Sequence, residues 1–173
     1  GVWKMIGKLR KRLQGGHVLR YHTRPEISHG QTVADHTCRV LTIVTTLWPD
    51  ISREAILYIL YHDVAESELG DLPATTKWNY PKLAEAYKQA EMKYETLIDV
   101  PVMFKQLSGE EKNIVKMADM LELVLHCKRQ LQMGNELAFE IYMNGVNYLK
   151  DNFANCDEYT PVKKILEELA NAR

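Results

Sequence analysis

The sequence predicts an all-α fold, a single bundle of about seven helices. Apolar residues recur every three or four positions along most of the chain, which is the period of an amphipathic helix. No run alternates apolar and polar residues for long enough to predict a strand. Glycine and proline stand between the periodic segments and predict the connections. With 173 residues, 46% of them hydrophobic, the chain has the length of one domain and needs no disulfide to fold.

The first half of the chain predicts three helices and one long loop. Gly15 ends the first apolar period, and no sustained period follows it before Thr32. Thr32 and Ser52 are residue types that cap helices, because their hydroxyl oxygens accept hydrogen bonds from free amides of the first turn. The expected elements are helix 2–14, loop 17–31, helix 32–48, helix 53–67 and a turn at 70–73.

The second half predicts four more helices. Pro81 suits the first position of a helix, where its missing N–H costs nothing. Ser108 and Glu111 have the spacing of a capping box, in which each side chain accepts a hydrogen bond from the other's amide. The expected helices are 81–98, 109–133, 135–152 and a short last one that begins at Thr160.

Composition excludes several classes of protein. The formal net charge of −1 argues against binding to nucleic acid through bulk charge. No apolar run approaches the roughly 20 residues that span a bilayer. Cys38, Cys127 and Cys156 are far apart, as is typical of a reducing compartment. We therefore expect a cytoplasmic protein (in the host cytoplasm if it is phage-encoded) with neither nucleic acid nor membrane as a partner.

Basic residues gather at the N-terminus. Residues 1–25 contain no acidic side chain, and their basic residues are Lys4, Lys8, Arg10, Lys11, Arg12, Arg20 and Arg24. One interpretation is a solvated helix face followed by a loop. The other is that Arg20 and Arg24 line an anion site, because a guanidinium donates two parallel hydrogen bonds to a phosphate.

Four side chains interrupt helices that should face the core: His36, His62, Asp63 and Asp119. Taken singly, a histidine of this kind is most simply a buried core residue, and an aspartate a cap or an ion-pair member. Together they form a mixed nitrogen and oxygen set on three predicted helices, which suits a divalent metal ion. Four protein ligands would leave an octahedral ion open positions for water and substrate, as in a catalytic site.

These residues carry a family resemblance. The order His36, then His62-Asp63, then Asp119 resembles the H…HD…D signature of the HD-domain metal-dependent phosphohydrolases. Residues 61–73 are similar to the Y-H-D-x-x-E-x-x-x-G-D-L-P core of the bacterial 5′-deoxynucleotidases, which small phage dATP triphosphohydrolases share. The resemblance implies one HD domain over 1–173, with its metal-binding core at about 18–125 and the C-terminal helices of 135–173 packed on that core.

The resemblance also implies roles for single residues. The positions that match the metal ligands are His36, His62, Asp63 and Asp119. Glu66 matches the catalytic carboxylate, and Asp71 matches an acidic residue that acts at the substrate sugar near its 3′-hydroxyl. The ligand types do not decide between Co, Mn, Zn, Ni and Mg.

Four further residues are expected at the substrate. Arg20-Tyr21 resembles an Arg-Trp pair in which the arginine holds phosphate and the aromatic ring crowds a ribose 2′-hydroxyl; here tyrosine replaces tryptophan. Arg24 follows in the same loop. Lys77 could offer its charge to a phosphate or could be an ordinary surface lysine.

The expected activity is hydrolysis of the 5′ phosphate ester of a 2′-deoxyribonucleotide. The basic N-terminus and the short chain favour a dATP triphosphohydrolase, which releases deoxynucleoside and triphosphate. A 5′-deoxynucleotidase that acts on deoxynucleoside monophosphates is the alternative, and a non-catalytic nucleotide-binding module is the second alternative. The expected partners are a small deoxynucleotide and further copies of the chain, in a dimer or hexamer.

Overall fold

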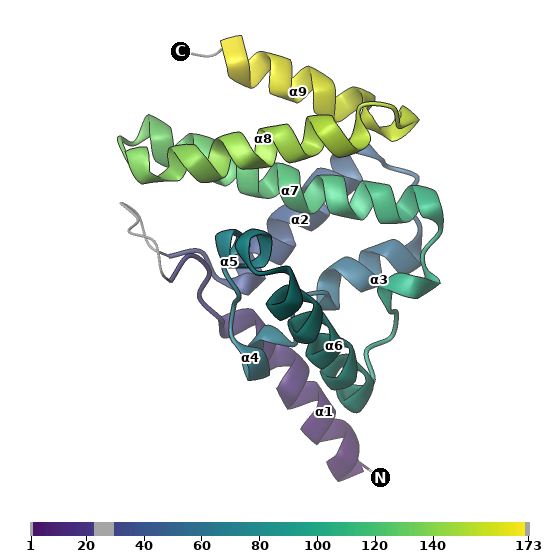
Figure 1. Cartoon of the computed structure of the whole chain (residues 1–173). Coiled ribbons are helices and arrows are strands. Elements are labelled where there is room, and N and C mark those ends of the chain that lie inside the picture. Colours follow the sequence, from purple (N-terminus) through teal and green to yellow (C-terminus); the bar gives the residue numbers. More distant parts are fainter. Residues whose placement is uncertain (1, 23–29, 172–173) are drawn as a thin grey trace.

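The computed structural model describes residues 2–22 and 30–171. Within these ranges the chain is helical, and its extended pairing is a single bridge between Leu19 and Thr32. The predicted all-α class is therefore confirmed. The α-helices are α1 (Val2–Gln14), α2 (Val33–Leu47), α3 (Arg53–Tyr61), α4 (Glu66–Leu69), α5 (Ala74–Asn79), α6 (Pro81–Ile98), α7 (Gly109–Gln132), α8 (Phe139–Phe153) and α9 (Thr160–Asn171) (Figure 1).

The helix caps lie where the sequence places them. The Thr32 hydroxyl accepts a hydrogen bond from the Asp35 amide, while the Asp35 carboxylate accepts one from the Thr32 amide. Ser108 and Glu111 form the same reciprocal pair at the start of α7. Each box satisfies two amides that the first turn leaves free. The beginnings of α2 and α7 are thus fixed by local sequence.

One predicted helix is wrong in its extent. The expected helix 53–67 ends at Tyr61, and α4 begins only at Glu66. Between these helices, backbone hydrogen bonds join residues three apart; the amide of Val64, for example, donates to the carbonyl of Tyr61. This tighter winding rotates the chain relative to an α-helix. Further on, α5 is a short helix that periodicity did not predict, and α8 begins at Phe139 after a 3₁₀ turn rather than at 135.

Helix α7 lies at the centre of the fold. Helix α8 packs along one face of α7, and α2 packs on the other, with α9 outermost (Figure 1). Leu121 and Val124 on α7 are fully buried, as is Leu149 on α8. The contact between α7 and α8 is close at Gly145, where an added Cβ atom would lie 2.8 Å from a methyl carbon of Val124. This face of α7 is an ordinary apolar core.

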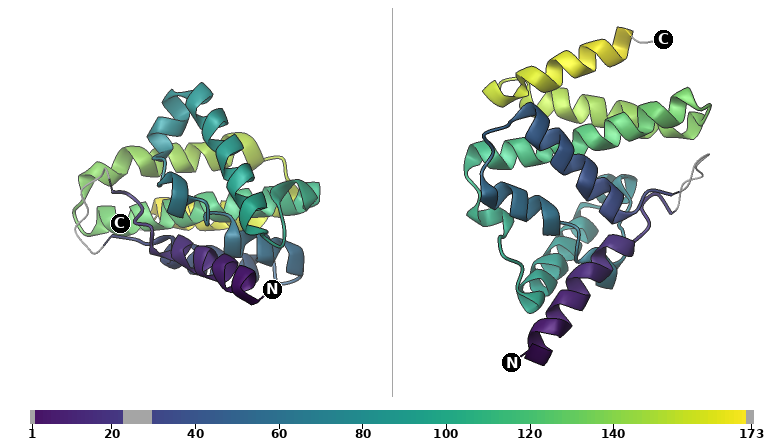
Figure 2. Two further views of the ribbon diagram at one scale, coloured as in Figure 1. Left: turned by 90° about the horizontal axis from the view of Figure 1, so that it is seen from below. Right: turned by 180° about the vertical axis from the view of Figure 1, so that it is seen from behind.

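Helix α1 lies beside α6, at the opposite end of the molecule from α9 (Figures 1 and 2). Arg12 donates hydrogen bonds to the carbonyls of Ile98 and Asp99, where α6 ends. The Lys8 ammonium lies 2.7 Å from the Asp99 carboxylate. These two basic side chains of α1 are therefore used in holding the helix to α6. Among the described helices, each is too short or too polar to cross a lipid bilayer.

Candidate metal centre and adjoining pocket

The four predicted ligands converge from three helices. His36 lies on α2, His62 and Asp63 directly follow α3, and Asp119 lies on α7. The Nε2 atom of His36 is 2.7 Å from Asp119 Oδ1 and 3.6 Å from Asp63 Oδ2. The Nε2 atom of His62 is 3.2 Å from Asp63 Oδ2 and 3.6 Å from Asp119 Oδ1. The structure thus brings together all four side chains that the sequence singled out.

The break after α3 explains how two consecutive residues reach one point. In a continuous α-helix, neighbouring side chains point about 100° apart. Here His62 ends α3, and its Nδ1 atom lies 2.6 Å from the carbonyl oxygen of Ile59. Since a carbonyl only accepts, Nδ1 carries the proton and donates. The tight turn that follows then directs Asp63 to the same place as His62 Nε2.

Both imidazoles are oriented as metal ligands are. His36 Nδ1 donates to the buried Glu122 carboxylate at 2.8 Å, as His62 Nδ1 does to Ile59. Each Nε2 atom is therefore directed toward Asp63 and Asp119. In the described part of the chain, the buried Nε2 atom of His62 has no hydrogen-bond partner. One ligand atom each from His36, His62 and Asp63 lies within 4.8 Å of the others, so this group can hold a metal ion.

The charges of the cluster suit a cation. Burial alone would raise the pKa of Asp119, but the imidazoles of His36 and His62 hold it well below its usual value. Burial opposes protonation of His62, yet Asp63 and Asp119 raise its pKa to about 10. The carboxylates therefore stay ionised at neutral pH and attract positive charge. A metal ion that binds here must compete with the imidazole protons.

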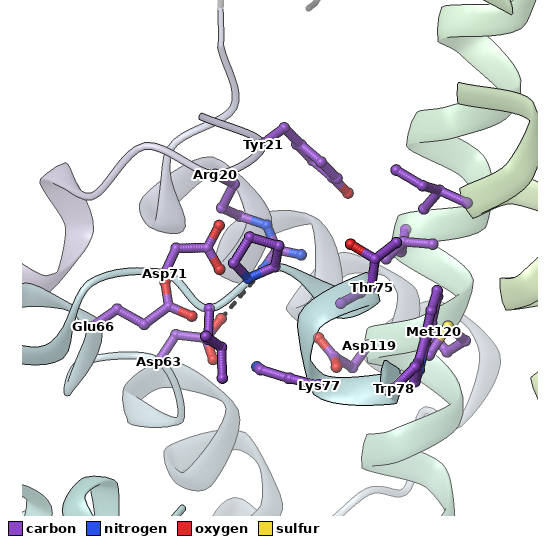
Figure 3. A pocket seen from close by; sticks show the side chains of 15 residues that line it. Arg20, Tyr21, Asp63, Glu66, Asp71, Thr75, Lys77, Trp78, Asp119 and Met120 are labelled. Atoms are coloured by element: carbon purple, nitrogen blue, oxygen red, sulfur yellow. Dashed lines mark hydrogen bonds and ion pairs between the residues drawn. The ribbon is translucent and has the colours of Figure 1, made fainter. Parts of the chain in front are cut away.

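A pocket of about 180 Å³ adjoins the cluster (Figure 3). Its lining includes predicted site residues from four parts of the chain: Arg20, Tyr21, Asp63, Glu66, Asp71, Lys77 and Asp119. Trp78 on α5 and Met120 on α7 form part of its apolar wall, and sequence reasoning assigned neither to the site. Helix α5 has only six residues, which is too few for an apolar period to reveal it.

Arg20 is a largely buried cation at the border between pocket and cluster. Its Nη1 atom lies 3.3 Å from Asp63 Oδ2, and its buried Nε has no partner within the described ranges. The backbone amide of Arg20 donates to the carbonyl of Gln31 at 2.8 Å, which fixes the segment. Lys77 contributes a second cation to the pocket. The predicted Arg24 lies outside the described residues.

Glu66 is a buried carboxyl group in the pocket wall. Glu66 is 4% exposed, and its Oε2 atom has no hydrogen-bond partner among the described residues. Burial, together with the charges of Asp63 and Asp71, raises the pKa of Glu66 to about 9. This raised pKa favours the protonated form of Glu66, which can donate a proton to a reacting group. Asp71 lies on the same side of the pocket, with one carboxylate oxygen 3.7 Å from His22 Nδ1 (Figure 3).

Tyr21 closes another side of the pocket. Its ring stacks on that of His126, with centroids 4.8 Å apart and planes 3° from parallel. Its backbone has φ 56°, a left-handed conformation that a non-glycine residue rarely adopts. The buried hydroxyl has no hydrogen-bond partner among the described residues. A planar ring held in this way can limit the shape of a ligand beside Arg20.

A family model described as 5′-deoxynucleotidase YfbR-like matches residues 18–169. Curated relatives include the 5′-deoxynucleotidases of Yersinia pestis (strain Pestoides F) and Yersinia pseudotuberculosis (serotype O:3, strain YPIII). Each is 35% identical over 92 residues, which cover 46% of this chain and 46% of the relative. The chain thus spans about half the length of the curated relatives it matches.

Solved structures share the fold. An HD-domain phosphohydrolase from Listeria innocua has a TM-score of 0.78 and 16% identity, over 98% of this chain and 90% of its own. The cyanophage S-2L HD phosphohydrolase DatZ, solved with dA and one catalytic Zn²⁺ ion, has a TM-score of 0.72 and 19% identity. That match covers 94% of this chain and 96% of DatZ. At these identities the similarity establishes a common HD-type helical fold.

Proposed function

This chain belongs to the YfbR-like 5′-deoxynucleotidase family, and on that basis we propose that it is a metal-dependent phosphohydrolase acting on the 5′ phosphate ester of 2′-deoxyribonucleotides. The observation that carries the proposal is the convergence of His36, His62, Asp63 and Asp119 beside a pocket that contains a largely buried arginine and a buried carboxyl group. In this proposal those four side chains hold the divalent metal. Such an ion, when bound, polarises a phosphoryl oxygen and lowers the pKa of a water molecule.

The other residues divide the remaining work. Arg20 binds the phosphate, since its Nη1 lies at the border of cluster and pocket and its Nε is free to donate. In hydrolysis, the oxygen of water forms a bond to phosphorus while the bond from phosphorus to O5′ breaks. Glu66 in its protonated form gives its proton to O5′, and the proton lost by the attacking water restores it.

The sugar lies between Tyr21 and Asp71 in this proposal. Asp71 accepts a hydrogen bond from the 3′-hydroxyl, and the Tyr21 ring leaves no room for a 2′-hydroxyl. Support comes from their positions in the same pocket and from the stack that holds the Tyr21 ring. The base then meets the apolar wall that includes Trp78 and Met120.

We propose a deoxynucleoside monophosphate as the substrate. The description of the matching family supports a monophosphate. Lys8 and Arg12 also support it, because both side chains bind the end of α6 and are therefore not free to bind a second or third phosphate. A dATP triphosphohydrolase is the second candidate. It is favoured by Lys77, a second cation in the pocket that could bind phosphates beyond the first.

Product chromatography tests both candidates. Protein loaded with Co²⁺ is incubated separately with dAMP, AMP, dATP and ATP. We expect deoxyadenosine and phosphate from dAMP and at least tenfold slower release from AMP. Deoxyadenosine and intact triphosphate from dATP, with little turnover of dAMP, would establish the second candidate. No product from any of the four, with Co²⁺ bound, would overturn the hydrolase and favour a non-catalytic nucleotide-binding module.

We also propose that the protein acts as a homo-oligomer, a dimer or a hexamer. Large apolar side chains are exposed on α6 and around the start of α8: Leu83, Met92, Leu97, Leu137, Phe139 and Met143. Surfaces of this kind are typical of contacts between subunits. Light scattering coupled to size-exclusion chromatography gives the mass directly, and a mass near 20.0 kDa would overturn the proposal.

A further inference from the structure

Glu122 is a buried acid outside the pocket, and the proposed function assigns it no part in binding metal or substrate. It lies on α7 three residues after Asp119 and is 0% exposed. Its Oε2 atom is 2.8 Å from His36 Nδ1. Its Oε1 atom accepts hydrogen bonds from Gln31 Nε2 and from Arg39 Nε, each at 2.8 Å. One carboxylate thus connects α7, α2 and the segment before α2.

All three partners of Glu122 are donors. Gln31 presents an amide N–H and Arg39 a guanidinium N–H, while His36 presents its Nδ1–H when Nε2 keeps a lone pair. An ionised carboxylate, which only accepts, satisfies all of them. A glutamine at 122 would place its own N–H₂ against at least one donor. The site is therefore built for a carboxylate rather than for any polar side chain of this size.

We propose that Glu122 is a positioning residue for the metal centre: it fixes His36 in the Nδ1–H tautomer, aims His36 Nε2 at Asp63 and Asp119, and joins this ligand to the substrate-binding segment. The orientation follows from the 2.8 Å contact to Nδ1, which leaves Nε2 2.7 Å from Asp119. Outer carboxylates of this kind raise the basicity of a ligating imidazole and restrict its rotation.

The connection to the substrate side passes through Gln31. Its side chain donates to Glu122, and its backbone carbonyl accepts from the amide of Arg20. The antiparallel β-bridge between Leu19 and Thr32 pairs the segment that contains Arg20 with the segment that contains Gln31. Arg20 and His36 therefore share one anchor. This places the phosphate-binding group and the metal ligand in a fixed relation.

Direct titration with Co²⁺ tests the role of Glu122 without any turnover. We expect Glu122→Gln to weaken Co²⁺ binding by about 10- to 100-fold. Glu111→Gln is the matched control, a glutamate in the first turn of the same helix whose loss should lower the melting temperature without changing Co²⁺ affinity. A Co²⁺ dissociation constant for Glu122→Gln within twofold of the wild-type value would overturn the proposal.

The tautomer of His36 provides a second measurement, which a general loss of stability would not change. Long-range ¹H–¹⁵N NMR of the imidazoles should show His36 as the Nδ1–H form in the Zn²⁺-loaded wild type and a mixture in metal-free Glu122→Gln at high pH. Should Glu122→Gln fail to fold, Arg39→Met decides the matter, because Arg39 is a 43% exposed side chain whose loss removes one donor. If Arg39→Met and Gln31→Met each bound Co²⁺ with unchanged affinity, the proposed role of Glu122 would be overturned.

Gln31→Met tests the connection to Arg20. On Co²⁺-loaded protein, binding of inorganic phosphate should weaken by a larger factor than binding of Co²⁺ itself, because the segment that holds Arg20 loses its side-chain bond to Glu122. An equal or smaller factor for phosphate would overturn the shared anchor. The inference rests on the proposed function only for the metal-binding role of His36. If Glu122→Gln weakens Co²⁺ binding as expected but the wild-type protein hydrolyses no deoxynucleotide, the proposed function is overturned and this inference stays intact.

Discussion

The two faces of α7 differ in what they hold. Toward α8, Val124 is fully buried beside Gly145, and Leu121 is fully buried in the apolar core. Toward α2, Asp119 and Glu122 are bound to the two nitrogens of a single imidazole, His36. Leu121 and Glu122 are neighbours in sequence, yet one contributes to the core and the other to the chemistry. The same helix can therefore be altered on one face while the other face reports whether the fold survives.

The stability of the polar face depends on the pairing of its charges, and the stability of the apolar face depends on how completely its side chains fill the space between the helices. Burying an unpaired carboxylate costs several kcal/mol, so each acid on the α2 side has a partner in place. On the α8 side, every methyl group fills space that nothing else fills. Changes on the polar face should thus remove function even in protein that still folds, and changes on the apolar face should lower stability while the folded protein keeps its metal site.

The largest effect is expected on the polar side. Asp63→Asn keeps the shape of a proposed metal ligand but removes its charge. Turnover of dAMP should fall by about 10³-fold or more, equivalent to roughly 4 kcal/mol of barrier, since metal catalysis is lost. The measurement is phosphate release at saturating substrate, made at a temperature where a thermal melt shows that the variant is folded. Retention of a tenth of the activity would contradict the role of Asp63.

On the apolar side, Leu121→Ala should reduce the free energy of unfolding by about 2–5 kcal/mol, because a fully buried side chain leaves a cavity. Urea unfolding gives the number, and Co²⁺ affinity of the folded fraction should stay within a few-fold of the wild-type value. Leu13→Ala, at a 64% exposed position on α1, is the control and should change stability by at most about 0.5 kcal/mol. A folded Leu121→Ala that cannot bind Co²⁺ would show that the two faces are not separable.

A smaller effect is expected from too much volume in the same interface. In Gly145→Ala the new methyl group would lie 2.8 Å from Val124, so α7 and α8 must move apart at a cost of about 1–3 kcal/mol. Gly7→Ala on α1 is the matched control, since an added Cβ there meets nothing within 4 Å. That change should stabilise the protein by roughly 0.5–1 kcal/mol through helix propensity. Equal melting temperatures for the two variants would contradict the close contact.

The smallest effect concerns the start of α7, away from both faces. Hydrogen bonds from Ser52 and Ser108 lower the pKa of Glu111 below its ordinary 4.5. This stabilisation is present above pH 4.5 and is lost as the pH falls through the lower pKa of the folded state. Glu111→Gln should therefore be less stable than the wild type at pH 7 by at most about 1 kcal/mol, and the difference should shrink as the pH is lowered below 4.5. Chemical unfolding at both pH values measures it, and a difference that grows on acidification would contradict this sign.

The sequence predicts the long helices because they depend on local signals, and it predicts the cluster because its residue types suit a metal ion and resemble the HD signature. Capping residues such as Ser108 fix where α7 begins, and the ligand types at 36, 62, 63 and 119 stand out against apolar neighbours. The break after Tyr61 could not be predicted, because it depends on how residues 62–65 pack in three dimensions. The contact between Gln31 and Glu122 joins residues 91 apart, so no periodicity reveals it. The pocket wall at Trp78 rests on a helix too short to give a pattern.

The contacts of α1 bear on the order in which the molecule opens. Arg12 and Lys8 hold α1 to the end of α6, some 86 to 91 residues away, while Met5, Leu9 and Leu13 remain exposed along the helix. A helix attached mainly by such exposed polar contacts can detach without disturbing the core between α7 and α8. In native-state hydrogen exchange, the amides of α1 should therefore exchange through local opening, whereas those at the centre of α7 should exchange only when the whole domain unfolds.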